Sequence, residues 1–584
     1  MEYRIAGVSR HAAVIAGVCA LTFLAGLGCP AVTDSDEAFY AQAAREMVDR
    51  GDWLTPYYNG EVRFEKPVLY YWLAAAAYAA TGVSPAAARL PSALAGIGLA
   101  LLAWACARRW YDDRTALLAG VVTATSFGYV AMARHALPDL PLAFFVTLAT
   151  WGAVVGLRVE PRGVGEHPAA DRWLIAAGAG AAAAFLIKGP VGIVLPAVVV
   201  VPVAAWTWLR GRRPVATRGA LLAAVAVFVV LAAPWYAAMA VEHGPAYVER
   251  FFVGENLDRF ATARYNDPRP LWYYLPVVAG GLLPWTPFTV LWLPALARAW
   301  RERRSGGADL RLALWALAPL AFYTISVGKQ PRYVLPVLPP LAVLLAAAMR
   351  RAAGAGAQTR GLLTGAAVAA GLLVALAAER LHAVRPLLVE RSGPWVAALA
   401  AASFVLGAAI VAAALVAHRD RAPTARRGGL VPALVAAASV LLAVGTYSVV
   451  LATPREAPVE RMAALVREAR GAGEPYCRYR VFTRNLVFYA GAPAVTPFGF
   501  DAVRDFLRGS DRALCVLLEP DAAELEAEGL PLERLGAVSY LDTGSLTVEA
   551  LLDPDPERHL RRVVLVANRP PPEPSPRGRD AHAR

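Results

Sequence analysis

Long apolar stretches, separated by short polar loops, recur along the chain from residue 11 to residue 450. Most are rich in Ala, Leu and Val and approach the roughly 20 residues that a helix needs to cross a bilayer. The pattern predicts thirteen transmembrane helices, at residues 11–31, 89–107, 115–133, 138–157, 173–187, 191–209, 218–240, 272–297, 310–328, 333–349, 360–378, 394–417 and 428–450. No convincing Ala-x-Ala cleavage site follows the first stretch, so it is interpreted as a retained helix and not as a secretory signal.

Arginine is concentrated in every second loop, which sets the expected orientation. The basic set comprises Arg4 and Arg10; Arg108, Arg109 and Arg114; Arg158, Arg162 and Arg172; Arg210, Arg212, Arg213 and Arg218; Arg298, Arg301, Arg303 and Arg304; Arg350, Arg351 and Arg360; and Arg419, Arg421, Arg426 and Arg427. Because positively charged loops stay in the cytoplasm, the N-terminus is predicted to lie inside and the C-terminal segment outside. The net charge of +13 follows from this topology and does not indicate a nucleic-acid partner.

Residues 67–80 are apolar enough to suggest a fourteenth span. A crossing there would put Arg108 and Arg109 on the outer side and break the charge pattern of every later loop. The segment is therefore predicted to be an interfacial or re-entrant helix. Its aromatic residues suit the headgroup zone of a bilayer and are Tyr70, Tyr71, Trp72 and Tyr78.

Residues 454–568 have a higher charge density and no long apolar run. Strand-like stretches at 480–482 and 514–516 alternate with helical ones such as 459–469, which predicts a small α/β domain. Residues 569–584 are rich in proline and charge and are predicted to be disordered. The α/β domain contains Cys477 and Cys515, which can pair if the domain is exported, although the sequence alone does not decide this.

The predicted fold class is therefore a polytopic α-helical membrane protein with a small soluble α/β domain. The membrane domain spans residues 1–453 and has a first outward loop at 32–88, with interfacial helices. A hydrophobic content of 57% and a mean hydropathy of +0.44 agree with this class.

Only three of the 58 basic residues are lysines, namely Lys66, Lys188 and Lys329. A compact ammonium is not interchangeable with a planar guanidinium, so a lysine in an arginine-rich chain invites a chemical reason. All three stand at breaks in apolar segments on the predicted outer side, which suggests a shared anionic site. The alternative is that they are helix-end lysines whose ammonium groups reach the interface.

The first outward loop is rich in carboxylates. It contains Asp36 and Glu37 near its start and Glu65 near its end, and residues 41–50 are predicted to form a short helix capped by the acidic residues. Acidic groups beside a bilayer are unfavourable unless they bind a cation or take part in proton chemistry. The alternative is a solvated loop whose carboxylates cap the helix.

Three further outward loops carry candidate residues. Asp139 begins a predicted span, where helix capping is the alternative role, and the neighbouring His135 is more readily explained as structural than as a ligand. Glu255 and Arg259 have the spacing of a helical ion pair, for which a plain surface salt bridge is the alternative. The outer mouth of the ninth and tenth spans carries Lys329, Arg332 and Tyr333.

These groups gather on one face of a membrane. Carboxylates can activate a hydroxyl or hold a metal, while lysine, arginine and tyrosine can stabilise a phosphate leaving group. The combination indicates transfer from a lipid-linked phosphate to an acceptor. No soluble nucleotide-binding fingerprint is present, which agrees with a lipid-borne donor and predicts no nucleotide cofactor.

The motifs at Asp36-Glu37-Ala38-x-Tyr40-Ala41, Arg45-Glu46-Met47, Gly51-Asp52-Trp53 and Phe64-Glu65-Lys66-Pro67 together resemble the polyprenyl-phosphate-dependent glycosyltransferases. This superfamily includes the lipid A aminoarabinose transferases and, more distantly, the protein O-mannosyltransferases. The resemblance implies a C-type glycosyltransferase fold in the bacterial inner membrane. It also implies a sugar donor on undecaprenyl phosphate or a related carrier, and transfer with inversion to an extracytoplasmic acceptor such as lipid A, another glycan or a protein.

The resemblance assigns roles to single positions. Asp36 matches an essential aspartate, expected to be a general base or to orient the acceptor, and Asp139 matches a second acidic position. Glu65 and Lys66 match a pair in which the glutamate can hold a divalent metal and the lysine meets the carrier phosphate. Lys188 and Tyr333 also match family positions near the phosphate. Lys329 and Arg332 are further candidates for phosphate binding because of their place at the outer mouth, and the expected supporting residues are Glu37, Tyr40, Glu255 and Arg259.

Two positions depart from the aminoarabinose transferases. Those proteins usually have arginine where this chain has Phe39, and histidine where it has Asn256. The first change removes a phosphate contact and the second a potential metal ligand. Both put metal dependence and the aminoarabinose substrate in question.

Two rival functions use the same residues differently. A transporter or flippase of lipid-linked sugars would bind phosphate at the same polar mouth without chemistry, and inverted repeats or mid-membrane charges would favour it. A membrane scaffold would leave the outward carboxylates and lysines without a role.

Overall fold

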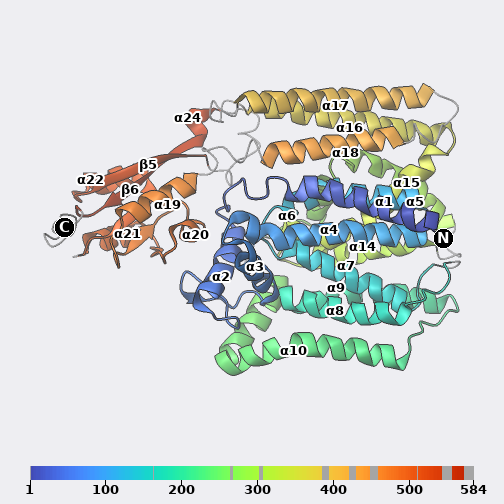
Figure 1. Cartoon of the computed structure of the whole chain (residues 1–584), viewed down its shortest axis with the longest axis horizontal. Helices are drawn as coiled ribbons and strands as arrows, with labels where there is room; N and C mark the ends of the chain where they lie inside the picture. The colour runs from blue at the N-terminus through green and yellow to red at the C-terminus, as the bar shows by residue number, and fades with distance from the viewer. Residues whose placement is uncertain are drawn as a thin grey trace.

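The structure, a computed structural model, describes residues 2–161, 164–262, 268–301, 307–384, 393–419, 429–447, 458–509, 511–541 and 555–570. It consists of a bundle of long helices with a small sheet domain at one end, and the N-terminus lies at the opposite end of the bundle (Figure 1). Residues 571–584 of the predicted disordered tail lie outside the described residues.

Nine helical segments of the described chain are long and apolar enough to cross a membrane. They are α4 (Pro85–Trp110), α7 (Asp139–Gly156), α8 (Ala170–Lys188), α9 (Val191–Leu209), α10 (Arg218–Val248) continued by η2 (Glu249–Asp258) and α11 (Arg259–Ala261), α14 (Ala308–Ile325), η5 (Pro331–Val337) continued by α15 (Leu338–Ala353), α16 (Ala357–Ala383) and α17 (Gly393–Arg419). The chain is thus a multi-pass membrane protein.

Two bent helix pairs raise this number to eleven if each is one span. The first is α5 (Asp113–Thr125) with α6 (Phe127–Ala133), and the second is η3 and α12 (Leu271–Tyr273 and Tyr274–Gly281) with η4 and α13 (Thr286–Leu291 and Trp292–Arg301). Shorter apolar helices, Arg10–Leu24 and α18 (Leu430–Gly445), coincide with the first and the thirteenth predicted span. Every predicted span therefore has a helix, while the total of thirteen crossings stays a prediction.

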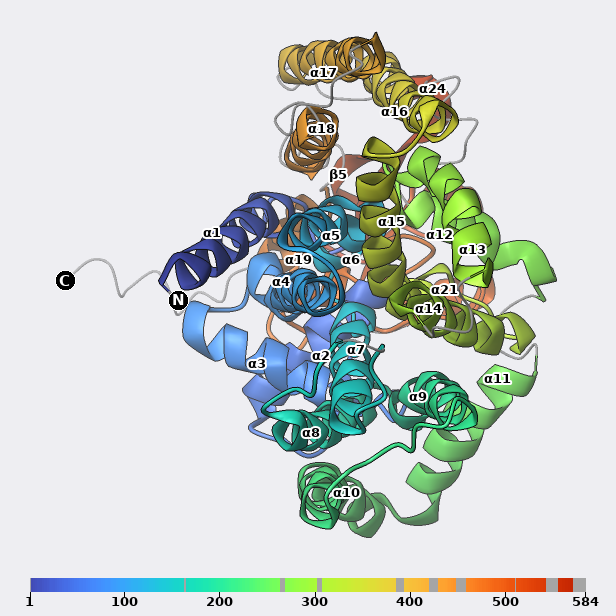
Figure 2. The ribbon, with the colours of Figure 1, turned by 90° about the vertical axis from the view of Figure 1, so that its right-hand side faces the viewer.

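Small residues let the long helices pack closely, as expected where apolar burial cannot drive association. A Cβ atom added to Gly178 of α8 would lie 2.2 Å from the Ala224 carbonyl oxygen of α10. One added to Gly371 of α16 would lie 2.7 Å from the Gly407 carbonyl oxygen of α17. The view along the bundle shows α10 at one edge and α16 to α18 at the other, with α4, α5 and α7 between them (Figure 2).

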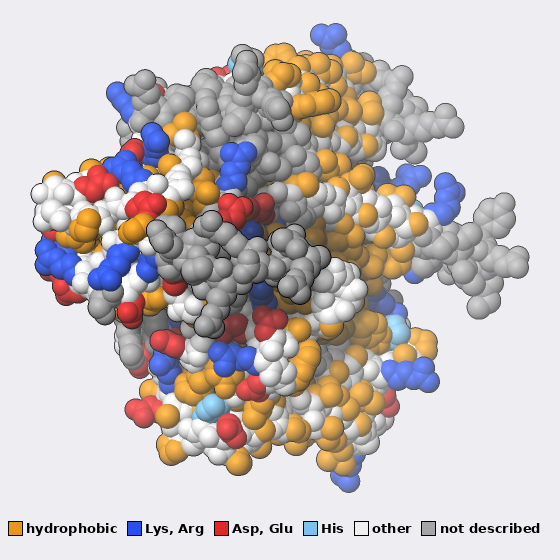
Figure 3. All heavy atoms as spheres, turned by 60° about the vertical axis from the view of Figure 1, so that its left-hand side comes forward, with side chains coloured by type: hydrophobic (Ala, Val, Ile, Leu, Met, Phe, Trp, Pro, Cys, Tyr) orange, Lys and Arg blue, Asp and Glu red, His pale blue; other side chains and the backbone are white. Residues whose placement is uncertain are grey.

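Several of the basic loops meet at the N-terminal end of the bundle. Arg109 pairs with Glu160 at 2.9 Å, and Arg212 donates to the Glu160 carbonyl oxygen at 3.1 Å. Arg351 pairs with Asp309 at 2.7 Å. Hydrophobic side chains cover much of the helical part between the charged side chains at its ends (Figure 3).

The segment predicted to lie at the interface forms α3 (Leu69–Thr81), which packs on α2 (Asp36–Arg50) and α4 at the end of the bundle next to the sheet domain (Figure 1). The expectation that its tyrosines lie among lipid headgroups is wrong. Tyr70, Tyr71 and Tyr78 are all buried within the protein. Their rings fill the space beneath α2, because its alanine-rich face leaves room for large side chains.

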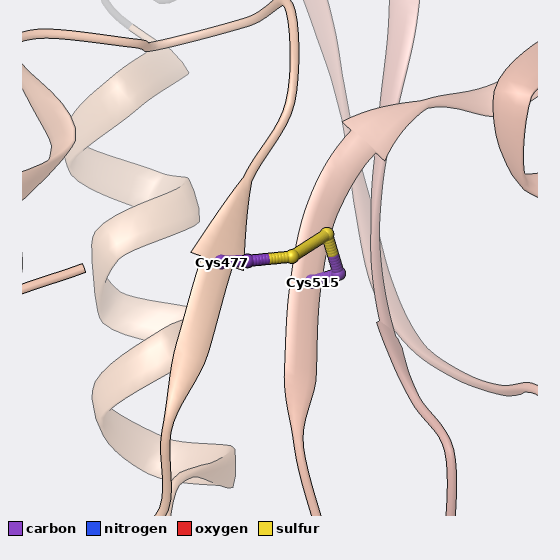
Figure 4. Close-up of a disulfide and its surroundings, with 2 residues drawn as sticks. All are labelled: Cys477 and Cys515. Carbon is purple, nitrogen blue, oxygen red and sulfur yellow. A yellow bond between two sulfur atoms is a disulfide. The ribbon is translucent and has the colours of Figure 1, made fainter. Parts of the chain in front are cut away.

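The C-terminal domain contains a four-stranded mixed sheet in the order β3-β4-β6-β5, made of Tyr476–Arg478, Leu514–Leu518, Leu560–Ala567 and Glu533–Leu541. Its helices are α19 (Pro458–Ala469), α20 (Leu486–Ala490), α21 (Phe500–Arg508), α22 (Glu519–Ala527) and α24 (Pro556–His559). The predicted helix at 459–469 and strand at 514–516 are confirmed. A disulfide joins Cys477 and Cys515 across the parallel pair β3 and β4 (Figure 4).

The predicted strand at 480–482 is wrong. Arg480 and Phe482 have φ values of 59° and 50°, in the left-handed region, so the chain turns sharply there. This turn directs the backbone of residues 483–485 towards the first outward loop, whose small hairpin is formed by β1 (Tyr57–Tyr58) and β2 (Glu61–Val62).

The sheet domain is docked on the first outward loop by hydrogen bonds. The Asp34 carboxylate accepts from the backbone N–H groups of residues 483–485 at 2.5–3.2 Å. Asn59 and Ala494 exchange two hydrogen bonds, of 2.9 and 2.8 Å. Hydrogen bonds to a charged group contribute about 1.5–3 kcal/mol each, so this contact holds the 483–485 turn at a fixed place beside α2.

Candidate functional site

Helix α2 places the first acidic residues. Ser35 is its N-cap and accepts from the Glu37 backbone N–H at 3.3 Å, so the helix begins at Asp36, five residues before the predicted start. Gly51 ends it in the left-handed conformation, with φ of 69°. Asp36 therefore stands in the first turn, where the helix dipole favours a negative charge.

A polar cavity of about 970 Å³ opens at this end of the bundle. Its wall contains seven cationic side chains and six carboxylates, and the residues used below are Asp36, Phe39, Tyr40, Arg63, Glu65, Lys66, Asp139, Lys188, Arg250, Glu255, Arg259, Arg332, Tyr333 and Arg484. The structure thus brings together most of the residues that the sequence pointed to, from loops up to about 300 positions apart.

One cluster in the cavity wall centres on Glu255. Its Oε2 accepts from Lys66 Nζ and from Arg259 Nη2, each at 2.9 Å. The predicted pair of Glu255 and Arg259 is confirmed, but the carboxylate side chain is only 4% exposed, so it is not a plain surface salt bridge. Lys66 Nζ also donates to the Glu65 carbonyl oxygen at 2.7 Å, which leaves the third N–H of the ammonium for another acceptor.

A second cluster centres on Asp139, which is buried at the start of α7. Its Oδ1 lies 2.6 Å from Lys188 Nζ and its Oδ2 lies 3.2 Å from Arg332 Nε. The side chain does not cap its helix, so the alternative role is not supported. Arg332 also pairs with Asp36, and Lys188 Nζ lies 4.4 Å from the centre of the Tyr333 ring. A continuous series of ion pairs therefore links the helices α2, η5, α7 and α8.

Burial and neighbouring charges change the acidity of two key groups. Burial lowers the pKa of the Lys66 ammonium to about 8, although Glu255 opposes the change. Burial tends to raise the pKa of the Asp36 carboxyl, but the charge and hydrogen bond of Arg332, with the charge of Arg484, lower it overall. Lys66 is therefore partly neutral at mildly alkaline pH, whereas Asp36 stays ionised and is a weak base.

An apolar groove of about 430 Å³ adjoins the cavity. The two spaces share the side chains of Glu65, Lys66, Lys188, Glu255, Arg259 and Tyr333. The rest of the groove is lined mainly by hydrophobic side chains, including Pro190, Val191, Val194, Phe251, Phe252, Phe260 and Phe322. A molecule with a charged head and a long apolar chain can therefore place its head at the shared wall and its chain in the groove.

Glu65 is surrounded by cations. Arg250 Nη2 lies 3.0 Å from its Oε1, and Arg63 Nη1 lies 3.7 Å from its Oε2. A divalent metal would compete with these guanidinium groups, and the part of the chain that the structure describes holds no group of three or more His, Cys, Asp or Glu side chains that could bind one. This donor set does not fit a metal ion, and no step below depends on one.

Two expected site residues have structural positions instead. Lys329 is buried and does not line either space; its Nζ donates to the Ser326 carbonyl oxygen at 2.6 Å. Glu37 is fully buried and faces away from the cavity, where its carboxylate pairs with Arg89 at 2.7 Å. His135 likewise bonds only locally among the described residues, through Nδ1 to the Ala131 carbonyl oxygen at 2.7 Å.

Three arginines of the cavity wall escape prediction from the sequence, namely Arg63, Arg250 and Arg484. Arg63 stands in the first outward loop, two positions before Glu65, so its place in the sequence could have marked it as a candidate. Arg250 and Arg484 lie in segments where arginine is common, and nothing in their neighbours distinguishes them. Their role depends on how distant segments meet in space.

Comparison with known proteins agrees with this geometry. Residues 25–244 match the family described as dolichyl-phosphate-mannose-protein mannosyltransferase. The chain is 32% identical over 416 residues to an undecaprenyl phosphate-alpha-4-amino-4-deoxy-L-arabinose arabinosyl transferase of Erwinia tasmaniensis, covering 70% of this chain and 72% of that protein. A protein of the same name from Pseudomonas aeruginosa is 38% identical over 321 residues, which cover 54% of this chain and 55% of the relative.

Solved structures support the fold. The crystal structure of ArnT from Cupriavidus metallidurans bound to undecaprenyl phosphate superposes with a TM-score of 0.72 and 23% sequence identity, covering 96% of this chain and 99% of that one. The predicted C-type glycosyltransferase fold is confirmed by this similarity. With the long relative from Erwinia tasmaniensis, these findings show that the chain belongs to the undecaprenyl phosphate-aminoarabinose arabinosyl transferase family, within the polyprenyl-phosphate-dependent glycosyltransferases.

Proposed function

We propose that the protein transfers a sugar from a polyprenyl-phosphate carrier to an acceptor that enters the polar cavity. The observation that carries this proposal is the junction between the cavity and the apolar groove. Cationic side chains at that junction suit a phosphate, and the hydrophobic groove suits an isoprenoid chain. The relatives' name specifies undecaprenyl phosphate, which we take as the carrier.

The carrier phosphate would contact Lys66, Lys188 and Arg259 at the shared wall. Lys66 and Lys188 each have at least one ammonium N–H group that donates no hydrogen bond to a described residue. Tyr333 lies between the two spaces and can donate its hydroxyl proton to the same phosphate. Charge-assisted hydrogen bonds of this kind are the strong ones, and they strengthen as charge develops on the leaving group.

In the transfer step, the bond between the anomeric carbon and the carrier phosphate oxygen breaks. Its electron pair passes to the phosphate oxygen, where Lys66 and Lys188 stabilise the added charge. An acceptor oxygen forms the new bond to the anomeric carbon from the opposite face, so the configuration inverts. The products are the glycosylated acceptor and the free carrier phosphate.

Asp36 lines the cavity but not the groove, so it stands on the acceptor side of the reacting carbon. A hydroxyl acceptor would give its proton to this carboxylate, whereas a phosphate acceptor is already anionic and needs only to be oriented. The pKa of Asp36 is lowered, because Arg332 outweighs burial, and this makes the carboxylate a weak base. We therefore assign it chiefly an orienting role.

We take the sugar and the acceptor of the proposed reaction from the family. The relatives' name specifies 4-amino-4-deoxy-L-arabinose, and lipid A is the acceptor that the resemblance implies. Asn256 departs from the family histidine, and its side-chain amide donates to the Phe251 carbonyl oxygen at 2.7 Å. It braces the turn of η2 at this position, so its chemistry favours a structural use over metal binding.

We also propose that the cavity faces the periplasm and that the N-terminus is cytoplasmic, in the inner membrane of a bacterium. Basic loops meet at the N-terminal end, and such loops stay in the cytoplasm. The disulfide of the C-terminal domain supports the same orientation, because disulfides persist in oxidising compartments. A transporter without chemistry is not favoured, since the relatives are named as transferases.

The test is incubation of the purified protein with a panel of undecaprenyl-phosphate sugars and lipid A, followed by mass spectrometry. We expect release of undecaprenyl phosphate together with a glycosylated product. The Asp36→Asn protein is expected to lose transfer by about 10²-fold, as for a lost orienting contact, while still binding the carrier. Movement of intact sugar-lipid across vesicles without release of free carrier would instead support the transporter.

The acidity of Lys66 predicts a pH dependence of carrier binding. Its pKa is lowered by burial from 10.5 to about 8, so the ammonium is charged below that pH and neutral above it. We expect the Kd for undecaprenyl phosphate to rise by about tenfold or more between pH 7 and pH 9.5. The Lys66→Arg protein should show a much flatter profile, because a guanidinium keeps its charge there. A wild-type Kd that does not change across this range would contradict the assignment.

A further inference from the structure

The wall of the polar cavity includes a cationic side chain that has no role in the transfer step described above. Arg484 reaches this wall from the C-terminal domain, and the groove is not lined by it. Six of the seven cationic side chains in the wall have a carboxylate within 4 Å, in the pairs described above. Arg484 is the seventh, and its guanidinium forms no ion pair or hydrogen bond with any residue that the structure describes.

The position of Arg484 is fixed by its backbone. Its N–H donates to Asp34 at 2.5 Å, and its carbonyl oxygen accepts from the Tyr58 hydroxyl at 3.0 Å. Both partners belong to the first outward loop. The residue is thus built into the wall of the site, although its side chain is exposed to the cavity.

The side chain is positioned by Phe39. The Arg484 guanidinium carbon lies 5.4 Å from the centre of the Phe39 ring, and that of Arg63 lies 4.5 Å from the same ring. A ring face attracts a guanidinium by roughly 0.5–1 kcal/mol at an exposed site and leaves its N–H edges available. The Phe39 ring thus holds the guanidinium groups of both Arg63 and Arg484 at the cavity wall.

We propose that Arg484, held on Phe39, binds an anionic group of the acceptor, so that the C-terminal domain completes the acceptor side of the active site. This inference rests on the proposed transferase function and adds a specificity-determining residue to it. Asp36 and Arg484 both line the cavity and neither lines the groove, and the Arg484 charge contributes to the low pKa of the Asp36 carboxyl. An acceptor that enters the cavity and reaches Asp36 can therefore also contact Arg484. A negative charge on the acceptor would then balance the positive charge of the Arg484 guanidinium.

The test compares binding with transfer in the full-length protein. Binding is measured without donor, using lipid A with both phosphates, the same lipid A after phosphatase treatment, and undecaprenyl phosphate. For Arg484→Gln, we expect the Kd for phosphorylated lipid A to rise by about 10- to 100-fold. The Kd values for dephosphorylated lipid A and for undecaprenyl phosphate should stay within about twofold of wild type, since neither ligand is assigned to Arg484.

Two further variants sharpen the result. Arg484→Lys keeps the charge and should recover part of the affinity for phosphorylated lipid A. Arg461→Gln is the matched control, because Arg461 is exposed on α19 of the same domain and does not line the cavity. In transfer assays Arg484→Gln should raise KM for the phosphorylated acceptor with little change in kcat.

The proposal is overturned if Arg484→Gln binds phosphorylated lipid A with the Kd of wild type. It is overturned too if its Kd for undecaprenyl phosphate rises as much as its Kd for phosphorylated lipid A. It is also overturned if dephosphorylated lipid A binds wild type as tightly as the phosphorylated form. A wild-type protein that binds phosphorylated lipid A through Arg484 but releases no carrier would contradict the transferase function and leave this binding site standing.

Discussion

Replacing Lys66 by alanine is expected to abolish most sugar transfer, with a loss of about 10²–10⁴-fold in rate. Lys66 stands at the junction of cavity and groove, and its ammonium is directed at Glu255 with one N–H left for the carrier phosphate. Without it, the leaving phosphate loses its ammonium contact and develops its charge beside Glu255, whose negative charge is then balanced less completely, by Arg259 alone of these two cations. The measurement is the rate of carrier release from the sugar donor that wild type uses, with the Kd for undecaprenyl phosphate as a second readout.

Lys329→Ala is the matched control for this change. Both residues are lysines at the same end of the bundle, and both donate to a backbone carbonyl oxygen, but Lys329 does not line either space. The fraction of Lys329→Ala protein that folds should bind the carrier and transfer sugar as wild type does. Full activity of Lys66→Ala, or loss of carrier binding in folded Lys329→Ala, would show that the site has been assigned to the wrong lysine.

Replacing Arg89 by methionine is expected to destabilise the protein by about 3–5 kcal/mol, through the buried Glu37 that it leaves unpaired. The Arg89 guanidinium donates to Glu37 at 2.7 Å and to the carbonyl oxygens of Leu27, Pro30 and Ala31 at 2.7–2.9 Å. Burial tends to raise the pKa of the Glu37 carboxyl, but Arg89 and other neighbours lower it to about 2, so the carboxylate stays charged. The measurements are the yield of monodisperse protein and its unfolding temperature in detergent.

Helix α4, which contains Arg89, also contains an arginine that serves as a control for that prediction. Arg108 of α4 pairs with Asp113 at 3.0 Å, but the carboxylate side chain is 65% exposed. Exposed ion pairs contribute about 0–1 kcal/mol, so Arg108→Gln should unfold close to wild type. Equal unfolding temperatures for the two variants would mean that the buried pair does not carry the stability assigned to it.

The buried ion pair of Arg89 and Glu37 also makes the stability of the protein depend on pH. The pKa of Glu37 is lower in the folded protein than its ordinary value of 4.5, so its contribution is present above that pH. It is lost as the pH falls towards about 2, when the folded-state carboxylate takes up a proton.

Most of the spanning helices were predictable because they are long and apolar and the loops between them carry arginine or proline. That Asp36, Lys66, Asp139 and Lys188 share one polar cavity was also predictable, since charges at the ends of apolar segments are unfavourable without a use. Their pairing was not predictable. Which carboxylate meets which cation depends on helix rotation and packing, and these follow from contacts such as Gly178 with Ala224.

The errors have a common physical origin. Glu37 and Asp36 are adjacent, yet one helical step of 100° turns the first into the protein and leaves the second at the cavity. Lys329 and Arg332 are equally close in sequence, and only Arg332 reaches the cavity. At 480–482, alternation suggested a strand, but the docking of the next three residues on Asp34 imposes a turn.

The docking of the C-terminal domain on Asp34 has a consequence for how the protein is made. Asp34 and the segment that it holds are about 450 positions apart, and a ribosome produces Asp34 first. The Asp34 carboxylate therefore stays hydrated until residues 483–485 have been synthesised and the C-terminal domain has folded. A chain that stalls before these residues lacks the part of the cavity wall that Arg484 supplies, so the complete cavity forms only after the C-terminal domain has been made.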